Sequence, residues 1–198
     1  MPKNGYYHNM ESRFHTEFYH DLDVIPLLPN MQNTWQKSIV CEEINEFLKL
    51  YNLDMSYQGI TAFISNSNSW YIGNPHVDVK INFDGSQHPI RTRFNILVLG
   101  DSFDKMFWWE NFSWGDPKME QTSFTSIIGN EYFSYCVPGN NPEERWGYLG
   151  KPTTEAINFL TPSAFVKTDC AHTVNVSVGR RLILTVAFDK DISEIIGP

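Results

Sequence analysis

Residues 171–188 have the sequence AHTVNVSVGRRLILTVAF, and this stretch decides the expected fold. It contains two segments rich in β-branched residues, 173–178 and 182–188, separated by a glycine turn, which is the pattern of two consecutive strands. His172 stands before the first segment, and Arg181 stands before the second, nine positions later. The stretch therefore predicts a pair of strands, one opened by an imidazole and the other by a guanidinium.

The chain upstream of this pair carries more strand patterns and one strong helical pattern. The strand patterns lie at residues 14–20, 60–64, 76–82, 91–98, 131–137 and 163–168. The helical pattern covers 34–51, with its apolar residues at Val40, Ile44, Phe47, Leu48 and Tyr51. These five positions share one face of a helix. A helix followed by about eight short strands indicates a mainly β sandwich or jelly-roll-like barrel.

The length of 198 residues suits a single domain with its own buried core. We expect one domain over residues 1–198, with an irregular N-terminal segment and supporting helix at 1–56 and the β core at 57–190. The stretch 101–122 has mixed character and is expected to be a long insertion or loop.

The formal net charge of −8 disfavours binding to the phosphate backbone of a nucleic acid or to an anionic membrane. Cys41, Cys136 and Cys170 are too few for a disulfide scaffold and fit a reducing compartment. The beginning of the sequence has no apolar stretch of signal-peptide length, and none approaches the roughly 18 apolar residues of a membrane span. These features predict a cytoplasmic protein without a nucleic-acid or membrane partner.

A second chemical motif lies near residue 76, where the chain has the sequence Pro-His-Val-Asp. Side chains at positions i and i+2 of a strand point the same way, so His76 and Asp78 would project together. With His172 they make two imidazoles and one carboxylate. That set holds one face of the metal in non-haem Fe(II) oxygenases and leaves the other face open.

The combined pattern resembles that of the Fe(II)- and 2-oxoglutarate-dependent oxygenases. The family shares His-x-Asp/Glu, a long gap, a histidine, and an arginine or lysine nine or ten residues later. The resemblance covers roughly residues 60–188. It implies a cupin-like double-stranded β-helix, with one or two N-terminal helices packed on one sheet. It further implies Fe(II), 2-oxoglutarate and O2, with hydroxylation of a substrate and release of succinate and CO2. The iron ligands would be His76, Asp78 and His172, and Arg181 would hold the distal carboxylate of 2-oxoglutarate.

Strand alternation extends this prediction to neighbouring residues. Arg181 is preferred over Arg180 because its spacing from His172 fits the family and its parity puts Leu182 and Leu184 on the face under the helix. On the strand at 91–98, alternation would place Arg93 and Asn95 toward the site. Some relatives, similar to aspartyl/asparaginyl hydroxylases, contact 2-oxoglutarate from this strand. Thr173, Asn175 and Ser177 are expected to face solvent.

Two alternatives remain open at this stage. The chain could be a cupin-like jelly roll that binds Zn, Mn or a ligand without oxygenase activity, or an interaction module in which the four residues match by coincidence. The aromatic segment 103–114 either plugs the barrel or forms a lid, with Trp108 or Trp109 contacting the substrate. The substrate could be an amino acid, a peptidyl side chain or a small molecule.

Overall fold

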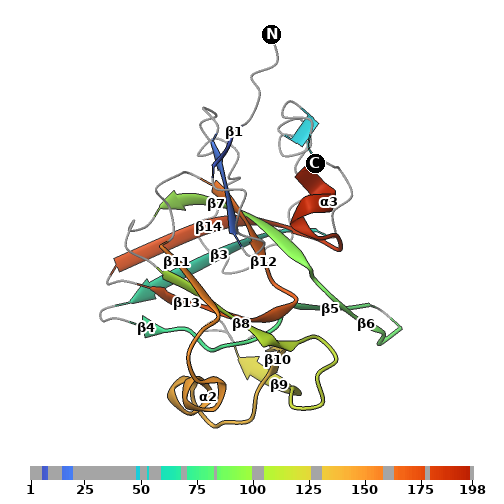
Figure 1. Cartoon of the computed structure of the whole chain (residues 1–198), viewed down its shortest axis with the longest axis vertical. Helices are drawn as coiled ribbons and strands as arrows, with labels where there is room; N and C mark the ends of the chain where they lie inside the picture. Colours follow the sequence, from blue (N-terminus) through green and yellow to red (C-terminus); the bar gives the residue numbers. More distant parts are fainter. Residues whose placement is uncertain are drawn as a thin grey trace.

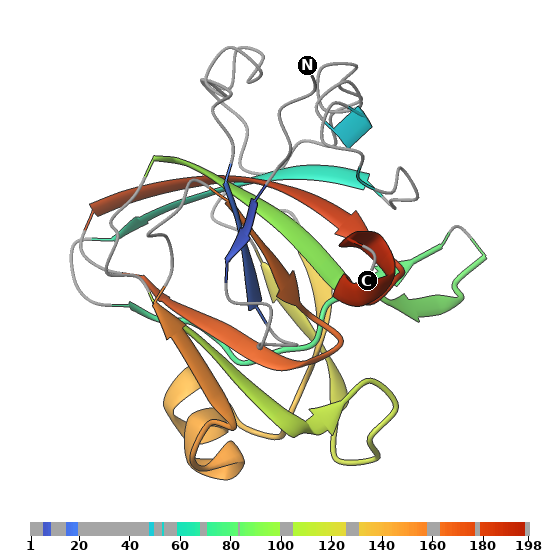
Figure 2. The ribbon, with the colours of Figure 1, turned by 45° about the horizontal axis from the view of Figure 1, so that its top comes forward.

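The computed structural model describes residues 6–8, 15–19, 48–49, 53, 59–67, 71–82, 84–99, 105–125, 131–157, 163–176 and 179–196. These residues form mainly β structure, as the sequence predicts (Figure 1). Two principal sheets lie as separate layers, which are clearest in the view of Figure 2. In the described part of the chain, no helix combines the length and the apolar character needed to cross a bilayer.

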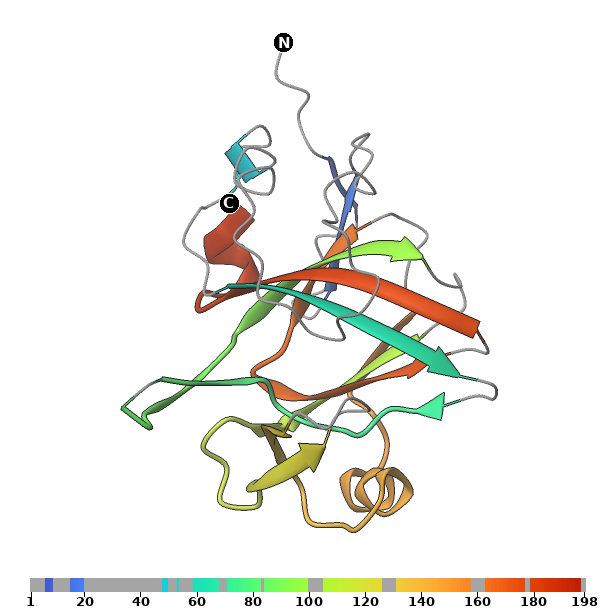
Figure 3. The same ribbon diagram turned by 180° about the vertical axis from the view of Figure 1, so that it is seen from behind.

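The first sheet has six antiparallel strands in the order β1-β2-β12-β7-β14-β3. Its strands are β1 (Tyr6–His8), β2 (His15–Tyr19), β3 (Gly59–Ser67), β7 (Thr92–Leu99), β12 (Ser163–Lys167) and β14 (Gly179–Phe188). The long strand β14 lies between β7 and the edge strand β3 (Figure 3). The strands predicted at 14–20, 60–64, 91–98, 163–168 and 182–188 are therefore confirmed.

The second sheet has four antiparallel strands in the order β11-β8-β13-β4. They are β4 (Tyr71–Ile72), β8 (Lys105–Ser113), β11 (Thr154–Ile157) and β13 (Cys170–Val176). Two short hairpins and two helices complete the described structure. These are β5 (Val79–Ile81) with β6 (Gln87–Pro89), β9 (Glu120–Thr125) with β10 (Glu131–Cys136), α2 (Pro142–Leu149) and α3 (Ile192–Ile196).

Apolar side chains fill the space between the two sheets. Met106 and Trp108 of β8 pack with Ala164 and Val166 of β12, together with Cys170. Trp108 is completely buried, and its indole N–H is satisfied by a 2.8 Å hydrogen bond to the carbonyl of Lys167. Burial of an aromatic ring of this size contributes strongly to the stability of the fold. The hydrogen bond offsets the free-energy cost of removing the indole N–H from water.

The opposite face of the first sheet is also apolar. Phe94 of β7 stacks on Phe165 of β12 at 4.5 Å, and Phe165 contacts Phe188 of β14 at 6.3 Å between ring centroids. A strand segment that is buried on both faces has no polar alternation, which explains why residues 183–188 of β14 are apolar except for Thr185. The helix predicted at 34–51 lies outside the described residues except for Leu48 and Lys49, which are helical; Leu48 is fully buried.

An insertion between β8 and β11, residues 114–153, carries β9, β10 and α2 and covers the outer face of the second sheet (Figures 1 and 3). Trp146 of α2 meets Phe107 and Trp109 of β8 edge to face, at 5.0 and 4.9 Å. Asn141 is the N-cap of this helix, because its Oδ1 accepts a 2.8 Å hydrogen bond from the Glu144 N–H.

Two expectations for this region are wrong. The stretch 101–122 was predicted to be a long insertion or loop, but residues 105–113 are the strand β8, whose apolar residues face both the core and the insertion. Thr173 was expected to face solvent, but it is 1% exposed beneath the insertion, and Asn175 is half-buried. Alternation correctly gives the outward direction of Thr173, but it cannot reveal that another segment covers that face. Ser177 lies outside the described residues.

Candidate metal centre

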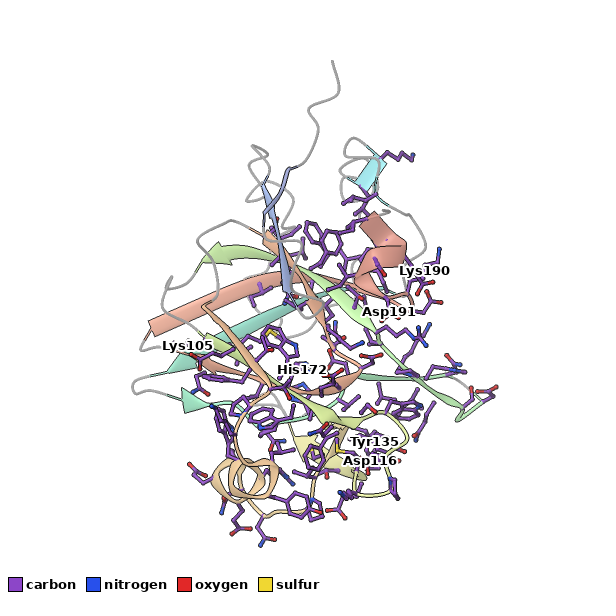
Figure 4. The ribbon with its side chains drawn as sticks, viewed as in Figure 1. Lys105, Asp116, Tyr135, His172, Lys190 and Asp191 are labelled. Atoms are coloured by element: carbon purple, nitrogen blue, oxygen red, sulfur yellow. The ribbon has the colours of Figure 1, made fainter. Side chains whose placement is uncertain are left out.

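His172 is the third residue of β13. Its register partner on β8 is Trp108, so the two side chains share the inner face of the sheet. The His172 side chain is 5% exposed, and its Nδ1 lies 2.9 Å from the Cys170 carbonyl oxygen. A carbonyl can only accept, so Nδ1 carries the hydrogen and the lone pair is on Nε2, ready to bind a metal. Figure 4 shows His172 near the middle of the molecule.

His76 lies across from His172 on a segment outside the named strands. Both residues donate backbone N–H bonds to each other's carbonyl oxygen at 3.0 Å, and their rings are 4.8 Å apart between centroids. His76 repeats the arrangement of His172, since its Nδ1 lies 2.7 Å from the Asn74 carbonyl oxygen. Glycine at 73 permits this close approach, because a Cβ there would lie 2.4 Å from Thr173 Oγ1. Both imidazoles therefore present Nε2.

Asp78 completes the cluster. Its backbone N–H donates to the Thr168 carbonyl, and its own carbonyl accepts from the Ile90 N–H, both at 3.0 Å. Its Oδ1 lies 3.4 Å from His76 Nε2, and its Oδ2 lies 3.9 Å from His172 Nε2. Ligand atoms of all three residues lie within 4.8 Å of one another, so one divalent ion can contact them all.

Arg93 pairs with the carboxylate from the facing strand β7. Its Nε donates to Asp78 Oδ2, and both side chains are largely buried. Burial alone would raise the pKa of the Asp78 carboxyl, but the Arg93 charge and the contacts with the two imidazoles hold that pKa well below its usual range. Asp78 is therefore ionised, and Arg93 balances its charge.

The two histidines differ in their proton affinity. Burial lowers the pKa of His172 to about 4, with the charge of Asp78 opposing the shift only in part. Burial also acts to lower the pKa of His76, but the hydrogen bond and charge of Asp78 and the Asn74 carbonyl outweigh it and raise that pKa. His172 is therefore a neutral nitrogen donor throughout the physiological pH range, whereas His76 holds a proton more readily.

The structure brings together His76, Asp78, His172 and Arg93. Arg93 pairs with the carboxylate of Asp78, and its predicted contact with 2-oxoglutarate stays a prediction. Asn95 is half-buried on β7 and is paired in register with Thr185. Thr185 Oγ1 is buried and has no hydrogen-bond partner among the described side chains and backbone.

The two arginines of β14 lie opposite β3. Arg180 is paired in register with Asn66 and Arg181 with Ser65. Their side chains are outside the described structure, so the preference for Arg181 stays a prediction. Arg181 precedes Ile183 by two residues and Thr185 by four. These three residues therefore have the same parity along the strand.

Trp108 and Trp109 are not on a lid. Both belong to β8, and their exposed fractions are 0% and 2%. Trp108 points between the sheets, whereas Trp109 points to the insertion, where its indole N–H donates to the Gly150 carbonyl at 2.9 Å. The alternative reading of this aromatic segment, rings that plug the fold, describes both residues.

Two residues behind His76, Asn74 and Arg145, have no signal of a functional role in the sequence. Asn74 supplies the carbonyl that His76 contacts, and Arg145 of α2 donates to the Asn74 side chain at 2.7 Å. These residues are separated by 71 positions, so only the folded chain brings them together. The Gly-Asn-Pro sequence at 73–75 marks a turn, but a turn signal does not indicate a role at a metal site.

Comparisons of the chain with models of known protein families, with curated proteins and with solved structures find no match. The function is therefore inferred from the site itself.

Proposed function

We propose that this chain is an Fe(II)- and 2-oxoglutarate-dependent oxygenase that hydroxylates an amino-acid, peptidyl or small-molecule C–H bond. The observation that carries the proposal is the convergence of His76, Asp78 and His172 to within 4.8 Å. Two imidazoles and one carboxylate form the facial set of ligands that non-haem Fe(II) oxygenases use. Zinc sites of the structural type instead have four protein ligands, often with cysteine sulfur.

The order of the strands supports a jelly-roll fold for the proposed enzyme. Eight strands make up two four-stranded sets, β12-β7-β14-β3 and β11-β8-β13-β4. Along the chain, consecutive members of the sets alternate between the sheets, except for β8 and β11, which lie in the same sheet on either side of the insertion. This alternation is the connectivity expected of a jelly roll; His76 and Asp78 follow β4, the second strand of the eight, and His172 lies on β13, the seventh.

The site residues have separate roles in this proposal. His76, Asp78 and His172 would hold the iron, which supplies oxygen activation when it and 2-oxoglutarate are bound. Arg93 keeps Asp78 ionised and oriented. Arg181 would bind the distal carboxylate of 2-oxoglutarate, because a guanidinium pairs with a carboxylate through two hydrogen bonds.

Two further inner-face groups support a polar ligand next to the metal. The buried Thr185 hydroxyl has no partner in the described structure, and its register partner Asn95 is half-buried. A buried hydroxyl without a partner costs about 1–3 kcal/mol, and a ligand carboxylate that accepts its hydrogen would recover that cost. Both residues lie on β7 and β14, the strands that also carry Arg93 and Arg181.

The test is the formation of succinate from 2-oxoglutarate by the purified full chain with Fe(II) and O2. It is measured alone and with panels of free amino acids and peptides. Turnover that is lost in Asp78→Ala and greatly reduced in Arg181→Ala, but kept in Arg180→Ala, is the expected result. Metal binding without any succinate, with or without added substrates, would instead identify a metal-binding jelly roll without oxygenase activity.

A further inference from the structure

We propose that the insertion takes part in the metal site, with Arg145 of α2 acting as a positioning residue for His76 through Asn74. The proposal rests on the metal site proposed above, and it adds a role for a segment that otherwise only covers the second sheet. It is carried by a continuous set of contacts from α2 to the His76 ring.

The contacts run through Asn74. Arg145 donates from one terminal nitrogen to Asn74 Oδ1 at 2.7 Å and from Nε to the Val137 carbonyl at 3.2 Å. The Asn74 carbonyl oxygen lies 2.7 Å from His76 Nδ1, and the Asn74 amide donates to Cys136 Sγ at 3.5 Å. The contacts of its side chain thus hold Asn74 in place. The backbone carbonyl of the same residue selects the tautomer of His76.

The backbone around His76 needs such support. His172 is paired with Trp108 in the ladder of β13 and β8, whereas residues 73–78 belong to no named strand and residue 76 makes only an isolated bridge to His172. Gly73 is held by a backbone bond to the Val174 carbonyl at 3.1 Å, and its own carbonyl accepts from the Trp146 indole at 3.4 Å. Both Trp146 and Arg145 belong to α2, so this helix supplies two of the contacts that place the segment.

The Arg145 side chain is buried in this position and held there by its neighbours. It is 6% exposed, and burying a guanidinium is costly unless its hydrogen bonds are made. Gly139 has a positive φ of 153°, and a Cβ there would lie 2.8 Å from Arg145 Cγ, so glycine leaves the room that the arginine fills. The capped start of α2 at Asn141 fixes the helix four residues before Arg145.

Loss of this link has a specific consequence. While Nδ1–H is held on the Asn74 carbonyl, Nε2 of His76 is the metal-binding nitrogen. Without the Arg145 contact, Asn74 can turn, and the neutral imidazole is then free to exchange its hydrogen between the two nitrogens. His172 should not respond, because its carbonyl partner Cys170 belongs to β13 itself.

The experiment is long-range ¹H–¹⁵N NMR of histidine-labelled, metal-free protein at an alkaline pH where both rings are neutral. It compares the wild type with Arg145→Met, Asn74→Ala and Asn74→Asp; the last keeps an acceptor for Arg145. The matched control is Arg91→Met, because Arg91 pairs with Asp191 at 3.0 Å, away from the insertion. His76→Gln assigns the signal.

We expect the wild type and the Arg91 control to have both rings in the Nδ1–H form. Arg145→Met and Asn74→Ala should give a mixture of tautomers at His76 alone, and Asn74→Asp should restore the wild-type form. Mn(II) affinity should fall about 10- to 100-fold in the first two variants. An unchanged His76 signal in Asn74→Ala overturns the proposal even if Arg145→Met fails to fold. A shifted His76 signal in a chain whose wild type binds no metal would retain the positioning role and reject the metal site.

Discussion

The two histidines of the site are oriented by the same hydrogen bond but supported by different parts of the molecule. Each places Nδ1 within 2.9 Å of the carbonyl oxygen two residues earlier. His172 is 5% exposed within β13, whereas His76 is 31% exposed on a segment outside the strands. One ligand lies within a strand of the second sheet, whereas the other is bridged to that strand by two backbone hydrogen bonds and, in our proposal, also depends on the insertion. We call these the sheet half and the insertion half of the site.

Substitutions of Trp108 and Trp109 should have the largest effects on stability. Trp108 packs between the two sheets, and Trp109 packs against the insertion. Trp108→Ala and Trp109→Ala should each lower the free energy of unfolding by about 3–5 kcal/mol, because each removes a buried ring and a satisfied N–H. Denaturant unfolding measures this. Only Trp109→Ala, which frees α2, should also alter the His76 tautomer. A variant at either position that keeps full stability but uncouples 2-oxoglutarate decarboxylation would restore the lid interpretation.

Removing the ligand of the sheet half should abolish tight metal binding. His172→Ala should weaken Mn(II) binding by more than about 100-fold, since even residues behind a ligand account for 10- to 100-fold. The circular dichroism spectrum should stay that of the wild type, because the surrounding strands keep their ladder bonds. Isothermal titration checks the affinity. If His76→Ala bound Mn(II) as the wild type does while His172→Ala did not, the insertion half would not belong to the site.

Arg93 reaches from β7 to Asp78. Its removal should change the stability of the protein and its metal affinity in opposite directions. Arg93→Met leaves the Asp78 carboxylate without its cation, so the metal-free protein should lose about 1–3 kcal/mol of stability, less than for a fully buried pair. The same change removes a positive charge beside the ion, so Mn(II) affinity measured without added anions should rise about tenfold. Arg91→Met, at an exposed ion pair, should change neither quantity measurably. A fall in metal affinity would show that Arg93 acts mainly by orienting Asp78.

The smallest expected effect is a difference in reaction rate between two buried thiols, Cys136 and Cys170. Burial raises the pKa of Cys136 to about 11 and that of Cys170 to about 12, so both should react slowly with iodoacetamide at neutral pH. Cys136 accepts the Asn74 amide in the insertion half, and Cys170 belongs to β13. If the insertion half opens more often, Cys136 should be modified first. Mass spectrometry of Cys41→Ser protein gives the two rates, and equal rates would argue that the halves open together.

The sequence predicts the sheet half better than the insertion half, for a physical reason. Alternation and turn signals act over a few residues, and they correctly give the strands that became β7, β12, β13 and β14. The same rules bring His76 and Asp78 to the same side, although residue 76 makes only an isolated bridge and residue 78 lies in no strand. Their spacing was sufficient because both side chains point toward His172.

The insertion half could not be predicted, because its contacts join residues far apart in the chain. Nothing near residues 105–113 indicates whether a strand with apolar residues on both faces is covered by a loop or by a helix such as α2. The link between Arg145 and Asn74 has the same origin. Arg93 was placed correctly on the inner face, but its partner depends on the distance between two sheets, which alternation does not give.

The most direct test of the account is the titration of metal-free full-length protein with Mn(II), followed by electron paramagnetic resonance. We expect one tightly bound ion for each chain in the wild type, and none in Asp78→Ala or His172→Ala. Binding that is absent in the wild type, or equally tight in both variants, would contradict the claim that His76, Asp78 and His172 form a metal centre.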